Sequence, residues 1–370
     1  MNSKVQSPRE VFIQDLMENN FTTFFVATHP KYSSVNPAFR FTPSPVSMAV
    51  PCSWSYVQAR KRLFEVGELL SVEEAERRNI NFVNPALKEF MPGATLPTLR
   101  GGIQLLLPSE RADSHRHSAN AFRVVLEAPD KGAYTAVEGS RIPMHRGDLI
   151  LTPNWTWHDH HNESDECVIW YDGLDVLMAF WIGATFYEER TDGSGAREYQ
   201  PILRDADAVT AACGPGLMHR RALYPEHIPV SNNALIYYPY KTARSLLQEL
   251  ADQGAGNPRE GILLEYVNPV NNGPVFPSTQ NCLRMINPGS TTQTVRRTEN
   301  IIFLTLEGSV TFHLPEGKRF STRTNDVTAI PSWVPCRIEN NGKQPAVLFS
   351  QSDRPVFQAL CFYREAVDPA

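Results

Sequence analysis

The feature that most constrains the fold of this chain is an internal repeat. Residues 117–127 (HSANAFRVVLE) match residues 297–307 (RTENIIFLTLE) at an offset of 180, and residues 147–155 (GDLILTPNW) match residues 325–333 (NDVTAIPSW) at an offset of 178. Self-similarity at a nearly constant offset indicates a duplicated structural unit. The 370 residues also exceed what one hydrophobic core usually serves. We therefore expect two copies of one fold.

Short apolar runs broken by turn sequences fill the repeated parts of the chain. Val, Ile, Leu, Trp and Thr dominate these runs, and Pro-Asp-Lys-Gly and Arg-Gly-Asp are among the turns. This texture is typical of antiparallel strands in a barrel or sandwich. It divides the chain into an N-terminal helical and irregular extension (1–98), a first β-module (99–190), a linker with a helix (191–260) and a second β-module (261–370). Capping and periodicity signals predict helices at 7–20, 56–70 and 242–252.

Composition excludes several classes of protein. With 42% hydrophobic and 20% charged residues the chain can fold around a core. A net charge of -5 makes a nucleic-acid partner unexpected. The most apolar stretch, 168–187, contains Asp172 and Asp175, so we expect it in the core and not in a membrane. Residues 1–20 lack a basic leader followed by an apolar segment, and the six cysteines are scattered singly, so we expect a cytoplasmic protein.

Three histidines of the first β-module form a candidate metal site. His115 and His117 are two residues apart, which on a strand directs both imidazoles to the same face. His158 follows a separate strand and turn, so it can approach the same point from a neighbouring strand. Three neutral imidazoles on one side of a cation leave the other side open for a substrate.

The second β-module lacks these ligands. Its matching residues are Val295, Arg297 and Cys336. We therefore expect the second copy to bind no metal and to have a structural role. Its interior is expected to be filled by apolar side chains.

The residues around His158 have the spacing of a known metal-binding motif. The pattern Gly147-x5-Pro153-x-Trp155-x2-His158 resembles the second cupin motif, with tryptophan where glycine is usual. The H-x-H pair resembles the first cupin motif, but without the glutamate that manganese-dependent cupins normally carry. The resemblance implies an all-β bicupin: two double-stranded β-helix (jelly-roll) barrels with the metal site in the N-terminal one.

The ligand set narrows the chemistry without fixing the metal. Imidazole-only ligation suits Zn, Fe or Cu. Three neutral ligands leave the charge of a divalent ion uncompensated, so the site favours a substrate that brings negative charge in chelating form. The carboxylate and phenolate of a 2-hydroxybenzoate meet that requirement.

Longer motifs resemble one family. They are LRGGIQ at 99–104, HRHSANAFR at 115–123, the segments 146–160 and 170–175, and PSWVP at 331–335. Together they resemble the gentisate 1,2-dioxygenase family, which includes ring-cleaving enzymes for salicylate, 1-hydroxy-2-naphthoate and 5-nitrosalicylate. The resemblance implies Fe(II) as cofactor, a small aromatic hydroxy acid and O2 as substrates, and a homotetramer. It also implies insertion of O2 between the carboxyl-bearing and the adjacent hydroxyl-bearing ring carbons.

The resemblance also implies roles for individual residues. The Fe(II) ligands are His115, His117 and His158. Arg123 binds the substrate carboxylate, a task that suits a guanidinium because it pairs bidentately with a planar carboxylate. Because Arg123 lies six residues beyond His117, we expect the two to share a strand face.

Four further residues have implied roles. Gln104 and His160 contact substrate oxygens, with His160 as the catalytic acid or base. Arg77 closes the pocket, and Asp172 is a supporting carboxylate. For these last two, an ordinary structural salt bridge is an equally open alternative.

Two neighbouring residues bear on substrate choice. Arg100 stands where relatives often have an aromatic residue, and if it points inward it favours a hydroxyl, oxyanion or nitro group at the 5-position of the ring. Gly102 is expected to leave room beside the ring. Gentisate or another 5-substituted salicylate is therefore the expected substrate. A zinc or manganese isomerase or decarboxylase, and a non-catalytic binding protein, stay open as alternatives.

Overall fold

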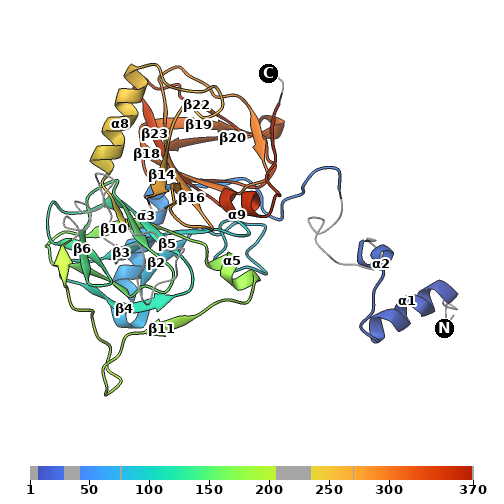
Figure 1. Cartoon of the computed structure of the whole chain (residues 1–370), viewed down its shortest axis with the longest axis horizontal. Coiled ribbons are helices and arrows are strands. Elements are labelled where there is room, and N and C mark those ends of the chain that lie inside the picture. Colours follow the sequence, from blue (N-terminus) through green and yellow to red (C-terminus); the bar gives the residue numbers. More distant parts are fainter. Residues whose placement is uncertain (1–6, 29–41, 76, 206–234, 270, 369–370) are drawn as a thin grey trace. The chain divides into compact units, whose positions relative to one another are not determined.

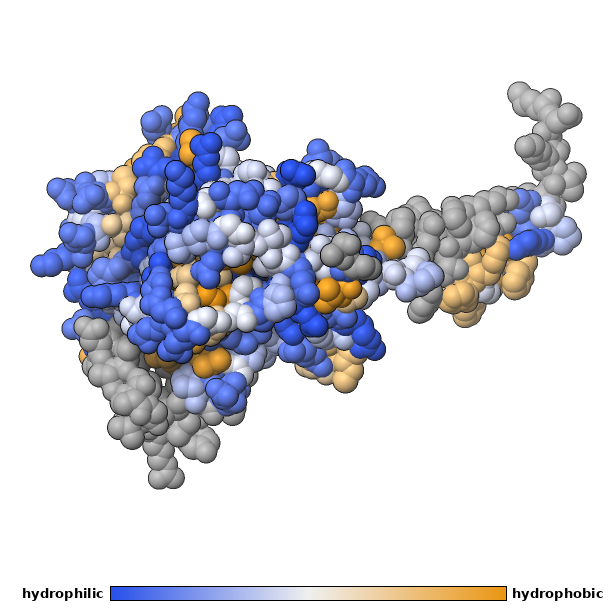
Figure 2. Space-filling model, turned by 90° about the horizontal axis from the view of Figure 1, so that it is seen from above, coloured by the Kyte–Doolittle hydropathy of each residue, from blue (hydrophilic) through white to orange (hydrophobic). Residues whose placement is uncertain are grey.

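The computed structural model describes residues 7–28, 42–75, 77–205, 235–269 and 271–368, which fall into two compact units (Figure 1). The first unit, Met1–Met48, contains α1 (Pro8–Glu18) and α2 (Phe24–Thr28). Ser7 caps α1: its hydroxyl accepts from the Glu10 amide, and the Glu10 carboxylate accepts from the Ser7 amide at 3.0 Å. The capping signal at 7–10 is thus confirmed. Apolar side chains such as Phe12 are exposed on this unit (Figure 2).

The second unit, Ala49–Ala370, is mainly β-sheet. Its helices are α3 (Tyr56–Leu69), α4 (Val72–Ala75), α5 (Val176–Trp181), α8 (Tyr240–Asp252) and α9 (Arg354–Ala359). Strands up to residue 205 are β1 (Cys52–Trp54), β2 (Arg78–Asn81), β3 (Arg100–Leu106), β4 (Arg111–His117), β5 (Ala121–Glu127), β6 (Ala133–Val137), β7 (Ser140–Pro143), β8 (Leu149–Thr152), β9 (His158–Asn162), β10 (Val168–Leu174), β11 (Tyr187–Glu189) and β12 (Arg204–Asp205). Later strands are β13 (Tyr237–Tyr238), β14 (Ile262–Asn268), β15 (Gly273–Pro274), β16 (Gln280–Ile286), β17 (Val295–Arg297), β18 (Ile301–Glu307), β19 (Ser309–His313), β20 (Arg319–Arg323), β21 (Val327–Ile330), β22 (Arg337–Glu339), β23 (Ala346–Ser352) and β24 (Glu365–Val367). The helices predicted at 56–70 and 242–252 are confirmed to within two residues.

The strand orders confirm the duplication. One sheet runs β13-β8-β5-β10-β3-β2, and its counterpart runs β1-β21-β18-β23-β16-β14-β15. Read in this order, the first six strands correspond one to one between the two sheets. A second sheet of the first β-module runs β11-β4-β9-β6-β7-β12. Its counterparts in the second β-module are two smaller sheets, β17-β24 and β20-β19-β22. Pairing is antiparallel except between β7 and β12.

In each of the two large matching sheets, one edge strand comes from the other half of the chain. β1 precedes the first β-module but pairs with β21 of the second, whereas β13 lies in the linker and pairs with β8 of the first. The helices that follow these strands, α3 after β1 and α8 after β13, each contact both modules. Tyr56 of α3 donates its amide to Asp326 (2.7 Å) and its hydroxyl to Glu127 (2.6 Å). Tyr240 of α8 likewise reaches both modules, through Asp148 (2.8 Å) and Glu307 (2.6 Å).

A buried carboxylate in each module joins the two copies. Asp175 accepts from the amide of Asn120 at 2.7 Å and from the hydroxyl of Ser278 in the second module. Asp353 accepts from the amide of Asn300 at 2.7 Å and from the hydroxyl of Thr98, which precedes β3. These exchanged contacts fix the first module against the second and so hold the sheets that carry the site.

Two expectations about packing are wrong in part. The interior of the second β-module is not purely apolar: Arg284 donates to Glu260 at 2.7 Å, and Arg297 donates to Glu365 at 2.8 Å. Buried charges are tolerated there because they are paired. Of the apolar stretch 168–187, β10 is core, but no residue of α5 is buried. Within the described residues, no helix is both long and apolar enough to cross a membrane.

Candidate metal centre and substrate pocket

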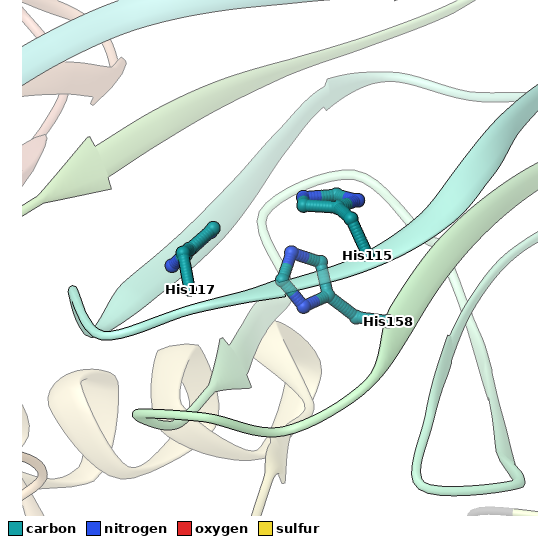
Figure 3. Close-up of side chains that lie close together, drawn as sticks. All are labelled: His115, His117 and His158. Carbon is teal, nitrogen blue, oxygen red and sulfur yellow. The ribbon is translucent and has the colours of Figure 1, made fainter. Parts of the chain in front are cut away.

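Two adjacent strands bring the three predicted ligands together (Figure 3). β4 supplies His115 and His117, and β9 begins with His158, which pairs directly with His115 across the strands. The ring centroid of His158 lies 4.1 Å from that of His115 and 4.9 Å from that of His117. One nitrogen atom from each ring can be chosen so that all three lie within 4.8 Å of one another. The alternation argument for the H-x-H pair is therefore confirmed.

Backbone hydrogen bonds set the protonation of all three rings. Nδ1 of His115, His117 and His158 lies 3.1, 2.8 and 3.0 Å from the carbonyl oxygens of Asp113, Ala119 and Thr156, respectively. Because a carbonyl oxygen can only accept, each Nδ1 carries the proton and each Nε2 keeps a free lone pair. Burial lowers the pKa of His115 and His158 well below the ordinary value and that of His117 to about 4. Three neutral imidazoles with free Nε2 atoms fit a divalent transition metal.

The backbone conformation of the turn before His158 explains why glycine is usual at the position where this chain has Trp155. Trp155 has φ 60°, and its counterpart Trp333 has φ 63°. This left-handed region favours glycine, which accounts for the usual residue at the position. The guanidinium of Arg116 lies 4.5 Å from the Trp155 ring, a contact that offsets part of the strain.

A cavity of about 270 Å³ opens beside the histidines, between the two sheets of the first β-module. Eight predicted site residues line it: Arg77, Arg100, Gly102, Gln104, His115, His117, Arg123 and Asp172. His158 and His160 are buried on one face of β9, with ring centroids 6.1 Å apart. Nδ1 of His160 lies 3.0 Å from the hydroxyl of Thr135. The structure thus gathers the predicted residues at one place.

Arg123 and Asp172 form a buried ion pair at the wall of the cavity. The two residues are paired across β5 and β10, with Nε 3.4 Å from Oδ1. The guanidinium also donates to Thr152 at 3.1 Å. Burial lowers the pKa of Arg123 to about 10, so the group stays charged at neutral pH, and burial raises the pKa of Asp172. Arg123 does not share a strand with His117, contrary to expectation, because residues 118–120 separate β4 from β5.

Buried polar atoms without partners converge on this region. Among the described residues they include Nε of Arg77 and Arg123, Nε2 of Gln104, His158 and His160, and Oδ1 of Asp172, whose ion pair with Arg123 is not a hydrogen bond. A buried polar atom without a hydrogen bond costs on the order of 1–3 kcal/mol. Several at one cavity indicate a polar ligand that satisfies them.

Arg100 and Gly102 both lie at the wall of the cavity. Arg100 points inward, since it lines the cavity, and its Nε donates to Oδ1 of Asn81 at 2.8 Å. Gly102 lines the same cavity, and the expectation that it leaves room beside the ring stays a prediction. A Cβ atom there would lie 2.8 Å from the carbonyl oxygen of Ile80, so the glycine permits the close approach of β2.

Sequence reasoning missed two polar residues of the cavity, Asn79 and Asn81. Both lie on β2, two residues apart, after Arg77. The alternation Arg-x-Asn-x-Asn at 77–81 is the signal that predicts a shared face. It spans only five residues, which is too short to distinguish a strand from an irregular segment.

The corresponding place in the second β-module holds no such cluster in the described residues. Val295 and Cys336 form an isolated bridge, as His115 and His158 pair in the first module. The correspondence of these positions is therefore confirmed. Arg297, which stands at the position of His117, forms ion pairs with Glu260 and Glu365.

Comparison with known proteins gives consistent matches. Residues 102–177 match the cupin domain family. The chain is 34% identical over 331 residues to gentisate 1,2-dioxygenase 1 of Aquipseudomonas alcaligenes, covering 88% of this chain and 89% of that protein. It is 34% identical over 320 residues to a 1-hydroxy-2-naphthoate 1,2-dioxygenase of Nocardioides sp. (strain KP7), covering 85% and 78%. The crystal structure of a salicylate 1,2-dioxygenase from Pseudaminobacter salicylatoxidans matches with a TM-score of 0.83 and 28% identity over 99% of both chains, and a structure of that enzyme with gentisate matches equally well over 100% and 96%.

Proposed function

Because this chain belongs to the gentisate and salicylate 1,2-dioxygenase family of cupin ring-cleaving enzymes, we propose that it cleaves a 2-hydroxybenzoate with Fe(II) and O2. Both oxygen atoms enter between the carboxyl-bearing and the adjacent hydroxyl-bearing ring carbons. The observation that carries the proposal is the cluster of three neutral histidines beside a cavity with unpaired polar groups.

The three histidines would hold the iron through their Nε2 atoms. Their backbone-bonded Nδ1 atoms support this assignment, because the rings cannot turn without losing those bonds. Bound iron supplies the one-electron and O2 chemistry that protein side chains lack.

Arg123 binds and orients the substrate carboxylate in this proposal. Its Nε faces Asp172 and its Nη1 donates to Thr152, whereas its Nη2 makes no hydrogen bond to the described residues, so a carboxylate gives Nη2 a partner. Asp172 and Thr152 hold the guanidinium from the side and so fix the direction in which it presents its donors. Arg77, whose Nε makes no hydrogen bond to the described residues, closes the pocket over the ring.

His160 and Gln104 contact the oxygen atoms of the substrate in this proposal. Nδ1 of His160 is engaged by Thr135, and its free Nε2 lies on the same strand face as His158. We assign His160 as the acid or base that exchanges a proton with the substrate hydroxyl. The amide of Gln104 donates to a substrate oxygen.

The finer architecture is also a proposal. Each pair of facing sheets would close as a jelly-roll barrel, giving a bicupin whose metal-binding copy spans 99–190 and whose degenerate copy spans 261–370. A homotetramer and a cytoplasmic location stay predictions from the family resemblance. Gentisate or another 5-substituted salicylate, such as 5-nitrosalicylate, is the proposed substrate.

Oxygen uptake tests the function directly. The protein is reconstituted anaerobically with Fe(II) and assayed with gentisate, salicylate, 5-nitrosalicylate and 1-hydroxy-2-naphthoate under ¹⁸O₂. We expect one O2 consumed per substrate and two labelled oxygen atoms in a ring-opened product. An isomerase or decarboxylase consumes no oxygen, so turnover without O2 would contradict the proposal.

A further inference from the structure

The walls of the cavity carry more positive than negative charge. Three guanidinium groups, of Arg77, Arg100 and Arg123, line it together with one carboxylate, Asp172. Arg123 lies 3.4 Å from Asp172, whereas the other two have no ion-pair partner within the part of the chain that the structure describes. The charged side chains of the wall therefore have two positive charges in excess.

A simple 2-hydroxybenzoate leaves this excess in place. Its carboxylate and phenolate carry two negative charges, which together balance a divalent metal ion, so the net positive charge of the wall is unchanged. Uncompensated charges in a site shielded from water are costly. A further negative group on the substrate reduces that cost.

Arg100 is placed to meet such a group. Arg123, Asp172 and Gly102 lie in one cross-strand row, and Arg100 lies in the next row, paired with Leu174. Neighbouring rows on one face of a sheet are about 7 Å apart along the strands, and Arg123 on β5 and Arg100 on β3 are also separated by β10, which adds about 10 Å across the sheet. The two guanidinium groups therefore suit two separate anionic groups better than one.

Asn81 fixes the orientation of Arg100. The bond from Nε to Oδ1 of Asn81 is the one hydrogen bond that the Arg100 side chain makes to the described residues. Both terminal nitrogens are left for an oxyanion, and a guanidinium binds a carboxylate or sulfonate bidentately. Asn81 is thus a positioning residue for this contact.

We infer that Arg100, held by Asn81, forms a second anion subsite that selects 2-hydroxybenzoates with an additional ring carboxylate or sulfonate. The group lies on the ring edge opposite the chelating pair, at position 4 or 5. This inference rests on the proposed function and narrows its substrate class to rings with a third acidic group.

Binding and turnover of matched ligands test the inference. Dissociation constants for 5-carboxysalicylate, gentisate and salicylate are measured by calorimetry on anaerobic Fe(II)-loaded protein, and kcat/KM is measured after O2 is admitted. Gentisate places an uncharged group at the same ring position and so separates charge from size. We expect 5-carboxysalicylate to bind at least about tenfold more tightly than gentisate, as a charge-assisted bidentate pair implies.

Variants assign that preference to Arg100. Arg100→Gln removes the charge and should abolish the preference for 5-carboxysalicylate over gentisate, whereas Arg100→Lys should retain part of it. Arg62→Gln, on the exposed face of α3, is the control for general loss of positive charge and should keep the ratio. A higher salt concentration should weaken the preference for 5-carboxysalicylate over gentisate in the wild type and leave the affinities of Arg100→Gln in the same ratio.

The outcomes separate the inference from the proposed function. Turnover of gentisate without preference for the carboxylated ring, or a preference that survives in Arg100→Gln, would overturn the inference alone. Failure of the Fe(II)-loaded protein to bind or convert any of the three ligands would overturn the proposed function and the inference with it.

Discussion

The exchanged contact between Thr98 and Asp353 offers a test of how the two copies support each other. Thr98→Val replaces the hydroxyl with a methyl group of similar size and removes one donor from a fully buried carboxylate. A hydrogen bond to a charged group contributes about 2 kcal/mol. We therefore expect the free energy of unfolding to fall by about 2 kcal/mol at pH 8. Thr98→Ser keeps the hydroxyl and is the matched control.

The pH dependence of this loss has a definite sign. Burial raises the pKa of Asp353 from 3.8 to about 6, and the donors Asn300 and Thr98 counteract part of that rise. The folded state thus holds a proton that the unfolded state has lost between these values, and stability falls by about 3 kcal/mol as the pH rises through them. Without Thr98 the folded pKa rises further, so the fall continues to higher pH.

Urea unfolding at pH 5 and pH 8 measures both effects. Thr98→Val should lose more stability at pH 8, where Asp353 is ionised, than at pH 5, where it is protonated. Ser278→Ala should likewise lose more stability above the folded-state pKa of Asp175 than below it, and burial raises that pKa. If Thr98→Val matches Thr98→Ser at pH 8, the carboxylate is not supported by the exchanged hydroxyl and the reasoning fails.

Two further predictions concern the second module and the cavity wall. Burial raises the pKa of Glu299 from 4.5 to about 7, so between these pH values the folded state keeps a proton that the unfolded state loses, and stability falls as the pH rises. Glu299→Gln should remove about 3 kcal/mol of that fall. If the free energy of unfolding of the variant depends on pH as steeply as that of the wild type, the prediction is refuted. Gly102→Ala should cost about 1–3 kcal/mol and lower the thermal midpoint, because its Cβ would lie 2.8 Å from a backbone oxygen. Gly193→Ala, with nothing within 4 Å, is the control, and equal midpoints for the two variants would contradict the packing argument.

Local patterns were enough to predict the core of the site. The two-residue spacing of His115 and His117 fixes their shared face on any strand, and the motif ending at His158 supplies the third ring. The duplication followed from the constant offset, and the sheet orders confirm it. These features depend on residues close together in sequence or on self-similarity, which one sequence contains.

Features that depend on distant pairing were not predictable in this way. The place of Gly102 against Ile80 depends on how closely β2 approaches β3, and no local pattern encodes that distance. The exchange of β1 and β13 between the copies likewise arises from contacts far apart in sequence. The domain boundaries at 98/99, 190/191 and 260/261 stay predictions.

The central claim is that three histidines bind the iron on which ring cleavage depends. Iron content after anaerobic Fe(II) reconstitution and desalting, measured for the wild type and for His158→Ala, tests it most directly. We predict one iron per chain with substrate-dependent oxygen uptake for the wild type, and loss of both in a variant that remains folded by circular dichroism. A folded His158→Ala that retains its iron and its oxygen uptake would contradict the account.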